Sequence, residues 1–455
     1  MKQVQPVSLE SLPLVNRQAA GLDIGSSEIW VAVPPASDPQ PVRAFGTFTP
    51  DLHALADWLS ACGVTTVAME STGVYWLPIY EILAARGLEV YLVNARHLKN
   101  VPGRKSDVQD CQWIQRLHSF GLLSASFRPE AEMAVLRAYL RQRAELIEQR
   151  AAHIQHMQKA LQLMNLQLTQ VLKDITGVTG QQIIRAIVAG ERNPVVLAQF
   201  RDKRCKHSTD EIAKALTGNY RPEHLFVLKQ ALHLYDTYTE QIAECDSEIE
   251  RQFSALKPRH DDDCLPPLDT SDKRDTHSKN APSYDARTLL YERLGVDLVA
   301  ITGLHASTVL TLLSEVGIEL TAFPTVKQFC AWLHWAPHND ISGGKVLRSR
   351  TLKAHNRAGQ LFRLAAQSAS RTQTEYGAFY RKICAKHGPK KAIVATAHKI
   401  ARTFYFMLTR REPYRATSAE QYAARERERT LARMSKKAKQ YGFVLVPDAS
   451  QPVAA

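Results

Sequence analysis

Gly21-Leu-Asp-Ile-Gly25 and Val67-Ala-Met-Glu70 are the two stretches that decide the fold of the first part of the chain. Each is a short apolar run of strand length that carries one carboxylate. Asp23 lies in the middle of the first run, where an unpaired charge is costly to bury, and Glu70 ends the second. An acid kept in such a strand indicates a functional site.

Outward from these runs, apolar residues recur at strand and helix spacing over residues 18–125. They predict strands at 21–25, 29–33, 42–48, 64–69 and 90–93, and helices at 52–62, 74–85 and 107–118. The first three strands follow one another so closely that we expect an antiparallel meander. The order β-β-β-α-β-α-β-α is that of the ribonuclease-H-like (RuvC-like) layer fold. In that order the first and fourth strands are neighbours, which places Asp23 opposite Glu70.

Two further acids, Asp107 and Asp110, stand three residues apart at the start of the last helix and therefore on one face. Four carboxylates at one place repel one another unless cations neutralise them. Oxygen ligands without His or Cys beside them favour Mg²⁺ or Mn²⁺, and two such ions about 4 Å apart can clamp a scissile phosphate. Taken singly, Asp107 is also explained as a helix N-cap, and Glu70 as a harmless strand end.

The run from Gly21 to Ser26 also resembles the first phosphate loop of actin-like sugar kinases and ATPases. That fold requires a second Asp-x-Gly strand and a Gly-rich adenosine loop, and the sequence downstream shows neither. The kinase interpretation is therefore a minor alternative to the metal site.

Residues 126–256 have the pattern of long helices. Apolar residues alternate at steps of three and four from 133 to 171, and again from Tyr235 to Leu256, which is the heptad pattern of a coiled coil. We expect an antiparallel coiled-coil arm that serves dimerisation and carries a helical insert near 174–222; a bundle inside one subunit is the alternative. Residues 257–290, with Asp261-Asp-Asp263 as a solvated acidic loop, are predicted to be a flexible linker.

A short pattern occurs twice, as Asp174-Ile-Thr-Gly-Val-Thr-Gly180 and as Ala300-Ile-Thr-Gly-Leu-His-Ala306. Both copies read as a tight glycine turn that opens a helix, which is typical of a helix-hairpin-helix element whose backbone N–H groups can hold a phosphate. The first copy is equally well explained as an ordinary helix start. The second precedes a basic region, so phosphate contact is favoured there.

Positive charge gathers in the last quarter of the chain. Residues 345–439 hold 24 Lys and Arg against five Asp and Glu, whereas the whole chain has a net charge of +13. Such asymmetry indicates a polyanionic partner, most often nucleic acid. Within 425–439, where Arg and Glu alternate, a self-pairing helix face is the alternative. We expect a mainly helical domain at 291–412 and a basic tail at 413–455.

The rest of the composition narrows the class of protein. The sequence has no apolar run long enough to span a membrane. Its seven cysteines are scattered and odd in number, which argues against a disulfide scaffold or a zinc ribbon and predicts a reducing cytoplasm.

The acids then carry a resemblance to a known family. Asp23, Glu70 and Asp107-Val-Gln-Asp110, with Gly103-Arg-Lys-Ser106 before the last pair, resemble the D-E-D-D set of RuvC-like insertion-sequence transposases related to the Piv/MooV DNA invertases. The second conserved region of that family is matched by Ile301-Thr-Gly-Leu304, Phe329–Leu333, Ser342-Gly-Gly-Lys345 and Arg357-Ala-Gly359. The likeness covers about 20–125 and 296–410. Cys111 stands where the family often has alanine, and the helical insert and the linker exceed the most compact members.

The resemblance also implies a nucleophile. Ser-Gly-Gly alone usually marks a turn, but in this family a serine placed like Ser342 attacks DNA and completes a composite site with the D-E-D-D domain. A covalent phosphoserine conserves the energy of the broken phosphodiester, and the sequence has no ATP-binding P-loop to replace it. The expected phosphate-binding residues follow the serine directly: Lys345, Arg348, Arg350, Lys353 and Arg357.

The sequence therefore predicts an α/β plus all-α DNA transposase or site-specific recombinase that uses Mg²⁺ (or Mn²⁺). Its predicted catalytic residues are Asp23, Glu70, Asp107, Asp110 and Ser342, and the four acids are the predicted metal ligands. The resemblance implies a non-coding bridge RNA as a guide and a location at the bacterial nucleoid. We also expect a dimer or tetramer, because the enzyme must hold two DNA duplexes. The alternatives are a RuvC-like endonuclease that hydrolyses branched DNA and a non-catalytic nucleic-acid-binding protein.

Overall fold

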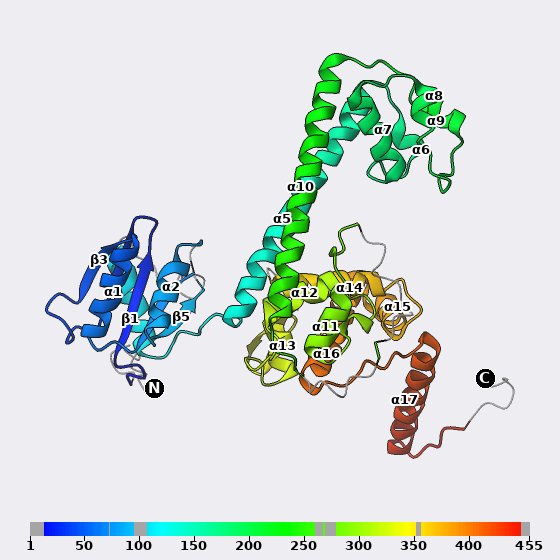
Figure 1. Cartoon of the computed structure of the whole chain (residues 1–455). Coiled ribbons are helices and arrows are strands. Elements are labelled where there is room, and N and C mark those ends of the chain that lie inside the picture. Colours follow the sequence, from blue (N-terminus) through cyan, green and yellow to red (C-terminus); the bar gives the residue numbers. More distant parts are fainter. Residues whose placement is uncertain are drawn as a thin grey trace. The chain divides into compact units, whose positions relative to one another are not determined.

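The computed structural model describes residues 13–71, 73–94, 107–259, 267–268, 279–351 and 356–446. The chain divides between Arg128 and Pro129 into two compact units, unit 1 (1–128) and unit 2 (129–455) (Figure 1). Unit 1 is mixed α/β, and unit 2 is mostly helical. Within the described ranges, no helix is both long and apolar enough to cross a membrane.

Unit 1 contains a five-stranded mixed sheet. Its strands are β1 (Ala19–Ile24), β2 (Glu28–Ala32), β3 (Val42–Gly46), β4 (Thr66–Glu70) and β5 (Glu89–Val93). They lie in the order β3-β2-β1-β4-β5. β1, β2 and β3 pair antiparallel, which confirms the predicted meander. β1 pairs parallel with β4, and β4 with β5, so the first and fourth strands are neighbours as predicted.

The two faces of this sheet are covered by different helices. The helices of unit 1 are α1 (Thr49–Ala61), α2 (Trp76–Ala85) and α4 (Asp107–Ser119). Leu22 and Ile24 of β1 belong to the core that α1 and α2 close. Since side chains alternate along a strand, Gly21 and Asp23 point to the opposite face, where α4 lies. At Gly21 a Cβ atom would come within 2.2 Å of the backbone nitrogen of Gln115, so only glycine lets α4 cross β1 this closely.

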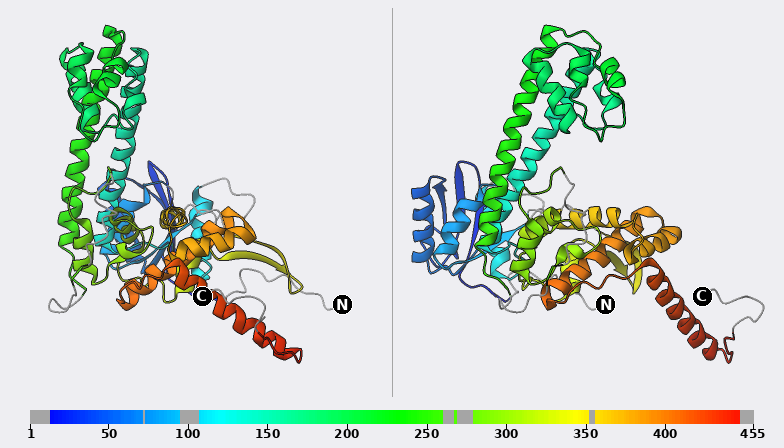
Figure 2. Two further views of the ribbon diagram at one scale, coloured as in Figure 1. Left: turned by 90° about the vertical axis from the view of Figure 1, so that its right-hand side faces the viewer. Right: turned by 45° about the vertical axis from the view of Figure 1, so that its right-hand side comes forward.

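Two long helices form the spine of unit 2, namely α5 (Ala131–Leu163) and α10 (Pro222–Ser254). Arg143 contacts Asp246, and Arg150 contacts Thr239 further along, so the two helices run antiparallel. They lie side by side over much of their length (Figures 1 and 2). This agrees with the predicted pairing of two long helices; the coiled-coil winding and the use of the arm in dimerisation stay predictions.

The apolar spacing predicted for the first long helix continues beyond the end of that helix. α5 ends at Leu163, and Asn165 turns the chain with a left-handed φ of 53°. Met164 and Leu168 keep the seam's spacing, but they are buried in a separate core beyond the helix end. The prediction of one continuous helix through the seam is therefore wrong after residue 163, where the chain turns and Leu168–Val171 form a separate short helix.

Residues 164–221, here called the tip, form a small helical module between α5 and α10 (Figure 1). Its helices are α6 (Leu168–Val171), α7 (Val178–Ala189), α8 (Pro194–Ala198) and α9 (Thr209–Ala215). Buried apolar residues from all four helices and from the ends of α5 and α10 make one core. The region of the predicted insert, near 174–222, thus contains α7, α8 and α9.

The remainder of unit 2 is a helical body with one hairpin. Its elements are α11 (Ala286–Leu294), η2 (Leu298–Ala300), α12 (Ala306–Val316), α13 (Val326–Trp332), β6 (Pro337–Ser342), β7 (Lys345–Thr351), α14 (Arg357–Ala369), α15 (Glu375–His387), α16 (Pro389–Arg410) and α17 (Ala419–Gln440). Phe329, Phe362 and Phe404, from α13, α14 and α16, are fully buried and pack edge to face. α17 buries no residue and is attached to α15 by the ion pair between Glu426 and Lys382.

Charged contacts join the body to the spine. Arg141 of α5 makes a two-oxygen contact with Glu315 of α12, at 2.9 and 3.1 Å. The buried guanidinium of Arg143 also donates to the carbonyl oxygens of Asn280 and Ala281. The described ends of the expected linker are therefore packed, and α11 begins at Ala286 inside it. Asp261-Asp-Asp263 lies outside the described residues.

Candidate active site

The first two acids are adjacent because their strands are. Leu22 of β1 is in register with Met69 of β4, so the next residues along the two parallel strands are Asp23 and Glu70. Parallel neighbours lie about 4.8 Å apart, and residues in register point to the same face. Both carboxylates therefore project from the α4 face, close to the carboxyl ends of their strands.

The other two acids come from the helix that crosses this face. Asp107 and Asp110 form the first turn of α4. Further along, α4 is held against the sheet by the close approach at Gly21 and by Ile114, which packs with Ala68 and Val93. Negative side chains suit a helix N-terminus, where the backbone dipole is positive.

The pKa of Asp23 reflects how close the four acids lie to one another. Burial, and then the negative charges of Asp107, Asp110 and Glu70, raise the pKa of Asp23 to about 6. A bond from the backbone N–H of Ile24 offsets only part of this. The structure thus gathers the four predicted acids from β1, β4 and α4, although the outermost two, Asp23 and Asp110, are 87 residues apart in the sequence.

Cys111 lies directly behind the acids. Its side chain is fully buried, and its Sγ donates to the carbonyl oxygen of Val108 at 3.2 Å. Burial, followed by the nearby charge of Asp23, raises the pKa of this thiol to about 12. Cys111 is therefore an uncharged packing residue at any physiological pH. An alanine, which the transposase family often has at this position, would also be uncharged.

The donor set fits a hard divalent cation. It consists of carboxylate oxygens, and besides burial it is their mutual repulsion that raises the pKa of Asp23, which such a cation would relieve. In the part of the chain that the structure describes, no three His, Cys, Asp or Glu side chains are already grouped as ligands of one ion. Binding an ion would therefore draw the carboxylates closer together.

Ser342 lies in unit 2, on the β6–β7 hairpin. Gly343 and Gly344 form its two-residue turn with φ values of 55° and 77°, and Ser342 pairs with Lys345 across it. Both positive φ values are typical of a type I′ turn, which explains the two glycines. The serine is exposed, as are Ile341 and Leu347 on the same hairpin, which are 61% and 71% exposed.

The predicted phosphate-binding residues follow along the hairpin and into α14. Lys345 and Arg348 are exposed on β7, where Arg348 pairs with Asp340. Arg357 is half-buried at the start of α14, next to the N-cap Asn356. The backbone of Arg350 pairs with His338, but its side chain and the whole of Lys353 lie outside the described residues.

Fold and sequence comparison together define the class of protein. A transposase model of the DEDD type, named for IS110, matches residues 20–166, and the model of the transposase IS116/IS110/IS902 family matches residues 297–381. The first match contains all four acids, and the second contains Ser342 and the basic residues after it. No curated protein matches the chain. The protein is thus a DNA transposase/recombinase enzyme.

More specifically, the chain carries both domains of the IS110 family of transposases, and the two matches together cover just over half of it. Neither match includes α7 to α9 of the tip or α17.

Proposed function

We propose that this transposase cuts and rejoins DNA strands at a site formed by Asp23, Glu70, Asp107, Asp110 and Ser342. The observation that carries the proposal is the cluster of four acids on one face of the sheet, where burial and then the charges of the other three raise the pKa of Asp23 to about 6. Because these negative charges repel one another on one face of the sheet, bound cations would stabilise the cluster. Divalent ions, when bound, would polarise the scissile phosphate and stabilise the charge of the leaving oxygen.

In the proposed reaction the Oγ atom of Ser342 attacks the scissile phosphorus. The bond from phosphorus to the bridging oxygen of the DNA strand breaks as the bond to Oγ forms, and the serine proton passes to a carboxylate of the cluster. The leaving oxygen becomes a strand-end hydroxyl. In the second half, a hydroxyl of another strand attacks the phosphoserine, which reseals the backbone and frees the serine.

The remaining partners follow from the same proposal. The exposed cations of Lys345 and Arg348, with Arg350, Lys353 and Arg357, would hold DNA phosphates beside Ser342. We further propose that a non-coding RNA encoded by the element guides the enzyme, and that two or four copies act together. Sequencing of nucleic acid that co-purifies with the full chain tests the guide directly; recovery of random fragments alone would remove it.

A hydrolytic nuclease of the RuvC type is the second candidate. It is favoured by one observation: Ser342 is exposed at the end of β6, where the Gly343-Gly344 turn alone accounts for its position. In that case water would attack the phosphate, and Ser342 would only terminate its strand.

A suicide DNA substrate, whose cleaved end diffuses away, separates the candidates. The recombinase predicts a covalent protein–DNA adduct that requires a divalent ion and maps to Ser342 by mass spectrometry. Ser342→Ala should abolish the adduct, whereas Ser349→Ala, an exposed serine on the same hairpin, should retain it. Full cleavage by Ser342→Ala would establish hydrolysis instead. If the protein binds DNA but breaks no strand with any divalent ion, the protein is a non-catalytic binding protein.

Mixing two inactive variants tests how the site is completed. Ser342→Ala and Asp110→Asn each lack one half of it. If a partner copy supplies the serine, the mixture regains adduct formation. If the serine acts within its own chain, the mixture stays inactive.

A further inference from the structure

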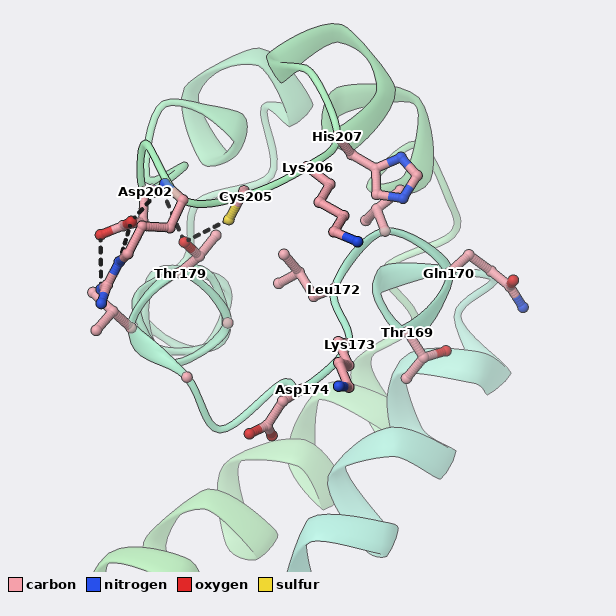
Figure 3. Close-up of a pocket in the computed structure, with 15 residues that line it drawn as sticks. Thr169, Gln170, Leu172, Lys173, Asp174, Thr179, Asp202, Cys205, Lys206 and His207 are labelled. Carbon is pink, nitrogen blue, oxygen red and sulfur yellow. Dashed lines mark hydrogen bonds and ion pairs between the residues drawn. The ribbon is translucent and has the colours of Figure 1, made fainter. Parts of the chain in front are cut away.

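The tip contains a cavity of about 520 Å³ that the proposed reaction does not use (Figure 3). One wall is the segment from Thr169 to Asp174, the second is the start of α7 at 177–180, and the third is the loop 202–207 between α8 and α9. Its volume is in the range of small-ligand sites. A single phosphate would not fill it, but a short stretch of a polymer would fit.

Two cations on different walls face this space. Lys206 extends into the opening from the loop, and Lys173 lies across it (Figure 3). Among the described residues, neither ammonium group is paired with a carboxylate. The neighbouring cations are already engaged: Arg204 binds Asp202, and His207 lies against Glu211. Lys173 and Lys206 are therefore available to an anionic ligand.

The loop that carries Lys206 is fixed by internal bonds. Arg201 donates to the carbonyl oxygens of His207 and Cys205, at 2.6 and 2.7 Å. Thr179 of α7 accepts from the backbone N–H of Asp202 at 2.9 Å and contacts the Cys205 sulfur. The third wall is thus tied to the second, and the cavity is formed before any ligand arrives.

A comparison of the two Ile-Thr-Gly turns supports this location. At the second turn, a Cβ on Gly303 would meet the carbonyl oxygen of Ala365 at 2.3 Å, and Leu304 is 1% exposed. That turn is packed against α14, so the structure does not favour the phosphate contact expected there. At the first turn, Val178 is 55% exposed and α7 has no side-chain cap. The open copy is the one that borders the cavity with two lysines.

We propose that the tip cavity binds the phosphate backbone of a nucleic-acid strand through Lys173 and Lys206. This inference rests on the enzyme's action on DNA, and it adds a second anchoring site whose lining residues lie outside both family matches. The ligand is a polyphosphate chain of DNA or RNA, held by charge without reading of bases.

The test is the affinity of the full-length protein for fluorescent nucleic acid at several salt concentrations. Lys173→Ala/Lys206→Ala should bind about ten-fold more weakly near 0.15 M salt, and the slope of log K against log salt should fall by about two, since each phosphate contact contributes roughly 0.9. The control is Lys203→Ala/Lys214→Ala, which removes two exposed lysines of the tip that do not line the cavity.

Separate titrations with duplex DNA, single-stranded RNA and inorganic phosphate identify the source of the ligand. A loss confined to DNA assigns DNA, and a loss confined to RNA assigns RNA. An equal loss of affinity in the control pair would show that binding depends only on the total charge of the tip, and would overturn the proposal. Unchanged binding of both polymers by the cavity variant would overturn it as well. A loss for inorganic phosphate alone would also overturn it.

The experiment is independent of the reaction. Binding is measured without divalent ions, so that no strand is cut during the titration. If the protein failed to transfer strands, the result for the cavity would still be valid. If the cavity did not bind nucleic acid, the proposed reaction would still be untouched. Matching thermal unfolding curves confirm that the exposed lysines have been removed without loss of the fold.

Discussion

In unit 1 the four acids are fixed by the core, whereas in unit 2 Ser342 lies on an exposed hairpin. The acids sit on two central strands and on a helix that touches the sheet at Gly21 with no room for a Cβ atom. The hairpin has only its own two strands, and such a ribbon is marginally stable alone. The difference teaches that the core fixes the backbone that carries the acids, while the position of the nucleophile depends on what binds over the hairpin.

The largest expected effect is the loss of an acid. Asp110→Asn should lower the rate of strand cleavage about 1,000-fold or more, because one ligand and one negative charge are lost from the proposed metal site. DNA affinity should change little. Asp57→Asn, which removes an exposed acid of α1, is the control and should stay within about two-fold. Cleavage at the wild-type rate by Asp110→Asn would remove the acids from the reaction.

Next comes the contact that fixes the acids. Gly21→Ala inserts a Cβ 2.2 Å from the Gln115 nitrogen, so α4 must shift, at a cost of about 3 kcal/mol in the free energy of unfolding. Cleavage should fall with it, since Asp107 and Asp110 move with α4. Urea unfolding followed by circular dichroism gives the stability. Gly87→Ala, which meets nothing within 4 Å, should cost only about 1 kcal/mol for its positive φ.

The same helix carries a buried histidine that makes its packing depend on pH. His118 is fully buried, contacts Thr66 Oγ1 at 2.8 Å, and has its pKa lowered by burial to about 4. The unfolded chain, with a histidine pKa near 6.5, binds the proton more readily. Stability is therefore complete above pH 6.5 and falls as the pH drops toward 4, by up to about 1.4 kcal/mol per unit.

His118→Gln isolates this contribution. Its free energy of unfolding should depend less on pH than that of the wild type between pH 6.5 and 4, with the two slopes equal above pH 7. Parallel curves over the whole range would show that His118 does not control the packing of α4.

The smallest effect on stability belongs to the hairpin. Gly344→Ala places a side chain at a φ of 77° with open space around it, so only the turn is strained, by about 1 kcal/mol. Cleavage should fall about ten-fold because Ser342 is displaced, while the melting temperature changes by no more than about 1 °C. A melting temperature that falls as far as that of Gly21→Ala would contradict the contrast between the two regions.

The acid site was largely predictable from sequence. Asp23 and Glu70 interrupt apolar strands, and the strand order makes them neighbours, so one topological rule brings distant residues together. The tip cavity was not predictable, because it depends on Arg201 and Thr179 fixing a loop by contacts that leave no periodic pattern. The choice between the two Ile-Thr-Gly turns failed for a related reason: nearby positive charge favoured Gly303, but the packing of α14 decides its exposure.

The most direct test of the central claim is the binding of Mn²⁺ to the full-length protein, measured by calorimetry at pH 7.5 without DNA. The account predicts that the wild type binds Mn²⁺ and that Asp23→Asn binds it at least ten-fold more weakly, because the most crowded carboxylate of the cluster is gone. Equal affinity and stoichiometry in the two proteins would contradict the claim that these acids form a metal site.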